Sequence, residues 1–341
     1  MGLKPTVAYR DMAKFVVKSI VRFVLLMLAV SFVVFALVSA SPIDPVQANV
    51  GQAAYANMSE AKRAALTQYW GGDTPLFERY IHWMGDLLQG DMGMSLRFNA
   101  PVAQVIAERA GNSFLLMFVA WVASGAFGFV LGVSAGVFRG SVIDKFVRGY
   151  CYVLAATPSF WVGLILLTVF AVWLGWFPLG LSVPVGASAG AVSAADVLSH
   201  LALPAITLSL VGVASIALHT REKAVDIMES DYVRFARVRG ESTGQTVVHH
   251  VLRNVALPAL TLQFASISEI FGGSVLVEQV FSYPGLGQAA VTAGVGSDVA
   301  LLAGIALVSA ALVFGGNTIA NVLYGVIDPR MRVNTHKGAI F

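Results

Sequence analysis

The chain has 341 residues, of which 57% are hydrophobic and only 12% are charged. Because soluble domains carry roughly 25% charged residues, this composition excludes an ordinary soluble enzyme and indicates a protein that lies largely in lipid. The net charge of +3 is too dispersed to indicate a nucleic-acid-binding surface. A single cysteine, Cys151, excludes an internal disulfide framework, a zinc ribbon and dithiol redox chemistry.

Six stretches are predicted as membrane-spanning helices, since a span needs about 20 mostly apolar residues. In the third stretch, Pro158 predicts a kink or an interfacial entry near Thr157. The predicted spans are residues 19–40, 113–138, 149–177, 200–218, 257–277 and 299–326.

Lys and Arg residues are unevenly distributed between the segments that join these spans. Short cytoplasmic loops retain positive charge, which orients a membrane protein. With the N-terminus inside, all but five of the 22 Lys and Arg residues lie on the cytoplasmic side. We therefore expect both termini in the cytoplasm. The exceptions share the long loop after the first span and are Lys62, Arg63, Arg79, Arg97 and Arg109.

Two segments between the predicted spans are too long to be simple connectors. Residues 41–112 contain two periodic stretches, Ser59 to Trp70 and Pro75 to Leu88, which predict short helices of an external subdomain. Residues 219–256 are densely charged with nearly balanced signs, which is typical of a docking surface. The predicted organisation is a cytoplasmic N-terminus with the first span (1–40), the external subdomain (41–112), a five-span core that includes the cytoplasmic loop 219–256 (113–326), and a cytoplasmic tail (327–341).

Small residues recur at spacing four in the second predicted span, at Gly128, Gly132 and Gly136, with Ser124 one step before them. This pattern lets helix backbones approach closely. We interpret it as a packing feature, not as a substrate site.

The sequence contains no G-x-x-x-x-G-K-[ST] phosphate-binding loop. If ATP drives this protein, another subunit therefore hydrolyses it. We assign no catalytic residue to the chain.

The cytoplasmic loop contains a run from Ser230 to Gly240 that predicts a short helix, with Ser230 as its N-cap and Gly240 as its stop. A second short helix is expected from Gln245 to Arg253. Two interpretations remain open at this point: an ordinary solvated connector, or a helix that inserts into a groove of a partner protein.

The run DYVRFARVRG, followed by HHVLRNVALPAL, resembles the cytoplasmic coupling loop of permease subunits in bacterial ABC importers, in the dipeptide, oligopeptide and nickel branch. Gly240 matches the Gly of the family's Glu-Ala-Ala-x-x-x-Gly motif, and Ala236 matches its second Ala. Arg234 and Phe235 stand where the wider superfamily has Glu and Ala. Further runs resemble the branch in the same order: SPIDPV (41–46, with Ile43 in place of Gly), GDMGMS (90–95), ATPSFW (156–161), LGWFPLG (174–180), LALPAITL (201–208), VFSYPGLGQ (280–288) and YGVIDPRMR (324–332).

The resemblance implies an all-α integral membrane protein with six transmembrane helices, the type I ABC importer permease fold, with an external helical subdomain between spans 1 and 2. It implies a multi-pass location in the bacterial cytoplasmic (inner) membrane, among membrane lipids. The implied partners are a second homologous permease in a heterodimer, two cytoplasmic ABC ATPases and an external substrate-binding protein, with no nucleic acid. No cofactor is expected on this chain, since ATP and Mg²⁺ would bind the ATPase subunits.

In such a system the coupling loop would convert closure of the ATPases into rocking of the spans, which exposes a central cavity alternately to each side of the membrane. We expect three arginines of the loop to meet acidic or carbonyl groups of the ATPase, or lipid headgroups. The coupling residues carried over from the resemblance are Asp231, Tyr232, Arg234, Ala236, Arg237, Arg239 and Gly240.

One acidic residue, Glu269, lies inside the fifth predicted span. An ionised side chain there costs roughly 2.5–3.5 kcal/mol on insertion scales, so exposure to lipid is not expected. Ser266, Glu269 and Gly273 are predicted to share one helical face that lines the pathway or the interface with the second permease. The alternative is a protonated carboxyl that is hydrogen-bonded to a neighbouring helix. We assign no metal ligand with confidence.

Two substrate classes remain open. The run from Ser268 to Glu278 is similar to the nickel-importing members and gives a slight lean towards nickel or a nickel chelate over di- or oligopeptides. A different class of protein, a secondary transporter or channel that works without ATPase subunits, predicts internal inverted repeats, and we see none.

Overall fold

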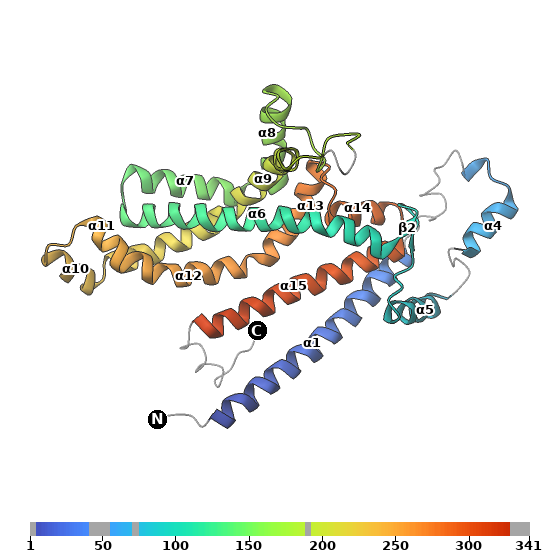
Figure 1. Cartoon of the computed structure of the whole chain (residues 1–341), viewed down its shortest axis with the longest axis horizontal. Helices are drawn as coiled ribbons and strands as arrows, with labels where there is room; N and C mark the ends of the chain where they lie inside the picture. Colours follow the sequence, from blue (N-terminus) through green and yellow to red (C-terminus); the bar gives the residue numbers. More distant parts are fainter. Residues whose placement is uncertain (1–4, 41–54, 70–74, 188–191, 328–341) are drawn as a thin grey trace. The chain divides into compact units, whose positions relative to one another are not determined.

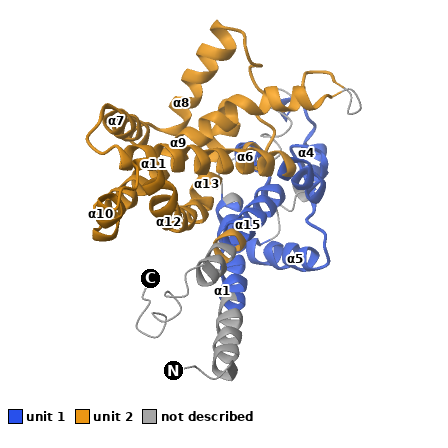
Figure 2. Cartoon of the chain, turned by 60° about the vertical axis from the view of Figure 1, so that its left-hand side comes forward, with its two compact units in different colours: residues 1–110, 289–314 blue, residues 111–288, 315–341 orange. Residues whose placement is uncertain are grey.

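The computed structural model describes residues 5–40, 55–69, 75–187 and 192–327 (Figure 1). The SPIDPV run at 41–46 and the predicted tail beyond residue 327 lie outside these residues. The described chain is mainly helical, as expected, and its contacts divide it into two compact units (Figure 2). Unit 1 comprises residues 1–110 and 289–314, and unit 2 comprises residues 111–288 and 315–341. The predicted division into cytoplasmic, external and membrane segments concerns the two sides of the membrane. Contacts within the chain do not test it, so this division stays a prediction.

Unit 1 is organised around an aromatic cluster. The first predicted span forms α1 (Pro5–Ser39), and α5 (Leu76–Leu88) packs against it through Trp83 and Tyr80. The Tyr80 ring lies edge-on to Phe35, and its hydroxyl lies 2.8 Å from the Ser31 hydroxyl. With α4 (Glu60–Tyr69), α5 confirms the short helices that the sequence predicts between the first two spans.

A short hairpin in unit 1, whose two strands have two residues each, is held in place by one buried carboxylate. Strand β1 (Met94–Ser95) pairs antiparallel with β2 (Ala100–Pro101). The hydroxyl of Ser95 donates to Oδ2 of Asp298 at 2.7 Å, and the Arg97 backbone N–H donates to the same oxygen at 3.1 Å. Asp298 precedes α15 (Val299–Ile327) and accepts from the Leu301 N–H through its other oxygen, so it also caps that helix.

By length and composition, four described helices are able to cross a membrane, or up to six if each of two bent pairs forms one span. The four are the apolar part of α1, α6 (Val102–Val137), α9 (Ala194–Met228) and α15. The bent pairs correspond to the predicted third and fifth spans. The six predicted spans therefore all coincide with apolar helices or bent helix pairs.

The predicted kink at Pro158 is present. Helix α7 (Val142–Ala156) ends before Thr157, whose extended backbone is the conformation that a following proline favours. Helix α8 (Ser159–Leu166) continues as the π-helix η1 (Leu167–Trp173), and the two arms of this pair are bent by 106°.

The glycine stripe of α6 packs against α9, as the spacing predicts. A Cβ on Gly132 would lie 2.6 Å from the Ala217 carbonyl oxygen, and one on Gly136 would lie 2.5 Å from Cβ of Ala224. A side chain at either position would therefore push the helices apart. On the same unit, α7 packs against α9 around the buried Cys151 and Ala217.

The charged loop is more helical and shorter than predicted. Helix α9 continues to Met228, ten residues beyond the predicted end of the span, and α10 (Asp231–Val238) follows at once. The predicted second short helix is not a separate element. The predicted range falls within one continuous helical segment, which comprises α11 (Thr243–Thr246), the π-helix η2 (Val247–Val251) and the start of α12 (Leu252–Ala265). Beyond Ser266 the chain forms α13 (Ile267–Val280) and α14 (Leu286–Val295).

Candidate functional site

Helix α10 carries most of the predicted coupling residues and is anchored through one narrow face. Its buried side chains are Val233 and Ala236, three residues apart, which face α9 and α11. This pattern explains why Ala236 is small: it holds the helix against its neighbours and does not itself face a partner. The predicted residues that are exposed are Asp231, Tyr232, Arg234, Arg237, Arg239 and Gly240.

Two apolar side chains on α10 are more exposed than Tyr232, the aromatic residue among the predicted ones. The exposed fraction is 65% for Phe235 and 84% for Val238, compared with 49% for Tyr232. Arg239 lies over the Phe235 ring, with Cζ 5.9 Å from its centroid. The outer surface of α10 therefore combines apolar groups with arginines, a composition typical of protein interfaces.

Gly240 ends α10 as predicted. Its φ of +94° lies in the left-handed region, which other residues adopt only with strain. Its N–H donates to the Arg237 carbonyl at 2.9 Å, and the N–H of Glu241 donates to the Ala236 carbonyl at 3.2 Å. These two bonds form a Schellman motif, which satisfies the last carbonyls of the helix. The predicted cap at the other end is wrong in detail: Ser230 occupies the N-cap position, but its hydroxyl donates back to the Ile227 carbonyl.

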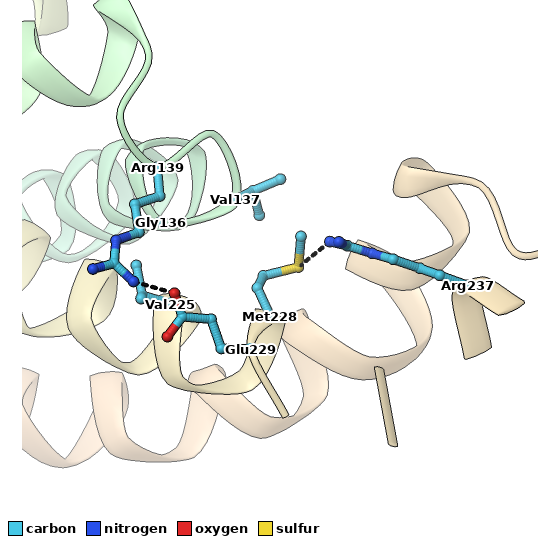
Figure 3. A pocket seen from close by; sticks show the side chains of 7 residues that line it. All are labelled: Gly136, Val137, Arg139, Val225, Met228, Glu229 and Arg237. Atoms are coloured by element: carbon cyan, nitrogen blue, oxygen red, sulfur yellow. Dashed lines mark hydrogen bonds and ion pairs between the residues drawn. The ribbon is translucent and has the colours of Figure 1, made fainter. Parts of the chain in front are cut away.

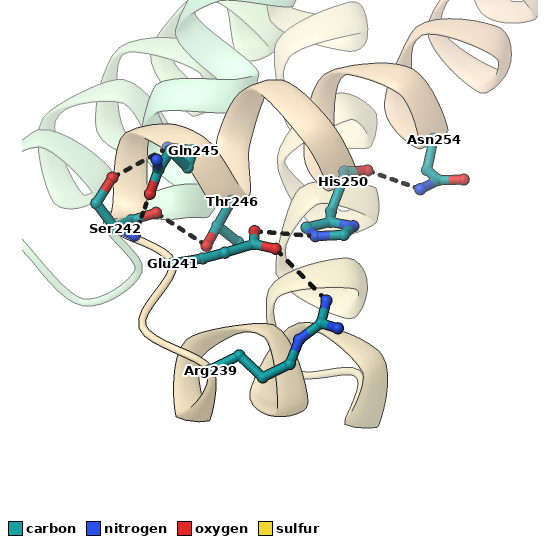
Figure 4. A network of polar contacts seen from close by, with 7 residues as sticks. All are labelled: Arg239, Glu241, Ser242, Gln245, Thr246, His250 and Asn254. Carbon is teal, nitrogen blue, oxygen red and sulfur yellow. Dashed lines mark hydrogen bonds and ion pairs between the residues drawn. The ribbon is translucent and has the colours of Figure 1, made fainter.

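A polar network holds the turn after α10 (Figure 4). The carboxylate of Glu241 lies 3.1 Å from Nε2 of His250 and 3.9 Å from Nη2 of Arg239. Ser242 and Gln245 form a capping box at the start of α11. The end of α10 is therefore tied by these contacts to η2, the segment that leads into α12. His250, which the sequence alone assigns no role, is part of this tie.

A shallow cleft of about 160 Å³ lies between α10 and the adjacent ends of α6 and α9 (Figure 3). Arg139 pairs with Glu229 on one side of it, and Nη2 of Arg237 lies 3.7 Å from the sulfur of Met228 on the other. Both contacts join helix ends that flank the loop. The cleft is lined by Gly136, Val137, Arg139, Val225, Met228, Glu229 and Arg237.

A buried ion pair fixes α7 to α9 near the same helix ends, and sequence reasoning missed it. Asp144 is 1% exposed and receives two bonds from the guanidinium of Arg221, at 2.5 and 2.9 Å. Its carboxylate also accepts from the Gly140 N–H at 2.8 Å. The local signal was a serine at the N-cap, Ser141, with an acid three residues later, but nothing local names Arg221 as the partner.

Of the predicted face of Ser266, Glu269 and Gly273, only Glu269 and Gly273 lie on one helix, α13, about one turn apart. The chain is bent by 49° between α12 and α13, at Ser266, so a count of helical turns does not run through this point. Ser266 is buried, and its hydroxyl donates to the Gln263 carbonyl. Gly273 faces Leu208 of α9, whereas Glu269 is exposed. Only Glu269 of the three is on an open face.

A second acidic residue, Glu278, is fully buried at the end of α13. Its carboxylate accepts from the Ser113 hydroxyl at 2.7 Å and from the Gln288 N–H at 3.0 Å. The Ser113 hydroxyl in turn accepts from the Leu286 N–H at 2.7 Å. Both side chains thus satisfy N–H groups in the first turn of α14. The sequence placed Glu278 in a recognisable run but did not single it out.

The turn between α13 and α14 closes over this carboxylate. Its Tyr283 is 1% exposed, and burial, together with the nearby charge of Glu278, raises the pKa of Tyr283 to about 12. Tyr283 therefore stays neutral in the physiological pH range, where its ring serves as packing.

Among the described residues, no group of three or more His, Cys, Asp or Glu side chains is placed to hold a metal ion. The exposed surface of α10 has the composition of a contact with another protein.

Comparison with known families shows the family to which the chain belongs. The family model described as the binding-protein-dependent transport system inner membrane component matches residues 128–333, and the model of the N-terminal part of this component matches residues 12–114. The chain belongs to this family. It is a permease, a multi-pass protein of the inner membrane with a type I importer permease fold.

Curated relatives resemble this permease over nearly its whole length. The oligopeptide transport system permease protein AppB of Bacillus subtilis is 33% identical over 94% of this chain and 99% of its own. The di/tripeptide transport system permease protein DppB of Pseudomonas aeruginosa is 33% identical over 89% of this chain and 94% of its own. A putative peptide permease protein of Brucella suis is 35% identical over 90% of this chain and 95% of its own.

Proposed function

We propose that this permease is one of two membrane subunits of an ATP-driven importer and that it passes di- or oligopeptides by alternating access. The names of the relatives support peptides as the substrate class, since these relatives are permeases for oligopeptides, di/tripeptides and peptides. The matches cover both the N-terminal segment and the core, so the likeness extends beyond the coupling loop.

The observation that carries the coupling role is the surface of α10. A short helix is held firmly at its base by Val233 and Ala236, while Phe235 and Val238 are left open beside arginines. Exposed apolar groups of this kind mark a protein interface. We assign this interface to a cytoplasmic ATPase subunit. The expected mechanism is that movement of α10 reaches α12 through Glu241 and His250.

The remaining parts of the assembly follow from this proposal. Two ATPase subunits bind ATP and Mg²⁺, a second homologous permease completes the pathway, and an external binding protein delivers the substrate. The excess of Lys and Arg in the loops supports a cytoplasmic location for both termini and for α10.

The lean towards nickel has no support from the relatives named above, which are named for peptides. It rested on Glu269 and on the likeness of the run from Ser268 to Glu278 to the nickel-importing members. A secondary transporter or channel is not favoured either, because the family is defined by systems that depend on a binding protein.

The test is ATP-dependent uptake into vesicles that contain the complete transporter with its binding protein. We expect uptake of labelled di- and oligopeptides that stops when ATP is withheld. Uptake of nickel or a nickel chelate without competition from peptides would contradict the peptide assignment. For the coupling role, we expect Phe235→Ala to lower ATP hydrolysis and uptake together, whereas Val185→Ala, at a loop residue that is 88% exposed, leaves both unchanged.

A further inference from the structure

The open side of α13 combines one carboxyl group with a glycine and a leucine. The exposed positions of this helix are Glu269, Gly272 and Leu276. Their spacings of three and four place them in a stripe on one side of α13. A Cβ built on Gly272 meets nothing within 4 Å, so the space beside Glu269 is open.

This stripe differs from the exposed surfaces of the other apolar helices. On α6, the exposed side chains include Phe118 and Phe127, each more than 60% exposed, and on α7 they include Phe146. Bulky apolar side chains suit contact with lipid tails. A stripe that contains a glycine and a carboxyl group does not, because lipid offers this group no hydrogen-bond partner.

The polar neighbours of Glu269 are already engaged. The Ser266 hydroxyl donates to the Gln263 carbonyl at 2.8 Å, and the Ser268 hydroxyl donates to Oδ1 of Asn317 at 3.0 Å. Within the described part of the chain, no hydrogen bond or ion pair is recorded for Glu269 itself. The oxygens of Glu269 are therefore left to bind water or a ligand.

We propose that this stripe lines the aqueous pathway and that Glu269 is a specificity-determining residue, which binds the cationic ammonium group of a peptide as the peptide passes. The proposal rests on the peptide-importer function. A carboxylate attracts an ammonium group, and Gly272 leaves room for the peptide backbone beside it.

Charge-selective labelling of cysteine variants tests this proposal without relying on peptide transport. The native cysteine is buried and is first removed as Cys151→Ala. Gly272→Cys and Leu276→Cys place a thiol about one and two helical turns after Glu269. Each variant is then treated, in the complete transporter, with cationic and anionic methanethiosulfonate reagents of equal size. Phe118→Cys serves as the matched control on a lipid-type surface.

We expect both stripe positions to react and Phe118→Cys not to react. After correction for reaction with a free thiol, the cationic reagent should react about tenfold faster than the anionic one, because a negative charge lies within one or two turns. Adding Glu269→Gln should bring this ratio close to one, and Glu269→Asp should keep it high.

Two results would overturn the proposal. If neither stripe cysteine reacts with either water-soluble reagent, the stripe faces lipid or protein and not the pathway. If both react but the ratio does not depend on Glu269, the stripe is wet and Glu269 is not a cation site. A wild-type transporter that fails to import peptides would instead contradict the proposed function and leave the labelling result standing.

Discussion

The hydroxyl of Ser113 donates a hydrogen bond of 2.7 Å to Oε1 of Glu278, although 165 residues separate the two along the chain. The bond joins α6 to the end of α13, and through Leu286 and Gln288 it reaches the first turn of α14. One buried carboxylate thus determines how the chain turns between two helices of unit 2.

Replacing this carboxylate by an amide should destabilise the permease. In Glu278→Gln, one oxygen becomes an NH₂ group that faces a donor, Ser113 or Gln288, and the lost bond leaves buried groups unpaired. We expect a loss of about 1–3 kcal/mol, measured as a lower melting temperature of the purified transporter. Ser113→Ala should have a similar effect, and the double variant should cost less than the sum of the two. Additive costs would show that the two side chains act independently.

The turn that encloses Glu278 should not tolerate a methyl group. A Cβ at Gly285 would lie 2.3 Å from Cδ of Glu278, so Gly285→Ala must displace the carboxylate. We expect a loss of about 1–3 kcal/mol, read from the same thermal unfolding measurement. Gly149→Ala is the matched control, because a Cβ there meets nothing within 4 Å and the helix α7 gains a better helix former. Equal stability of the two variants would contradict the close contact between Gly285 and the Glu278 carboxylate.

Replacing Gly240, which ends α10, should impair the coupling of ATP hydrolysis to transport more than it impairs folding. Gly240 has a φ of +94°, and a β-branched residue there is strained by roughly 1–2 kcal/mol. Gly240→Val should therefore shift α10 and lower peptide uptake per ATP hydrolysed. We would measure uptake and ATPase activity side by side, with Gly244→Ala as the control, since Gly244 has open space and no positive φ. Unchanged stoichiometry in Gly240→Val would refute the docking assignment of α10.

The ion pair between α7 and α9 should contribute far more than the pair on the surface beside it. Asp144 is 1% exposed, and Asp144→Ala leaves the Arg221 guanidinium without its main partner. We expect a loss of about 3–5 kcal/mol, as for other broken buried pairs. Glu229 is 57% exposed in its pair with Arg139, so Glu229→Gln should cost no more than about 1 kcal/mol. Chemical denaturation that finds similar costs for the two variants would show that Asp144 is not the stronger anchor.

Local patterns predicted the spans well because a span is a property of about 20 consecutive residues. The kink at Pro158 and the end of α10 at Gly240 also depend on single residues and their immediate neighbours, and both are confirmed. The end of α9 was predicted at residue 218 from the charges that follow. Charge marks where a chain leaves the membrane, not where a helix ends, and α9 continues to Met228.

The sequence by itself determined the class of protein, the order of the spans and the short helix α10, since composition, a proline, a glycine and a set of short motifs are all local. Only the tertiary structure decided which residues meet. Packing of helices that are far apart in the sequence brings Ser113 to Glu278 and Asp144 to Arg221. The tertiary structure also separated Ser266 from Glu269 and Gly273, because the 49° bend between α12 and α13 interrupts the helical repeat on which the common face of all three depended.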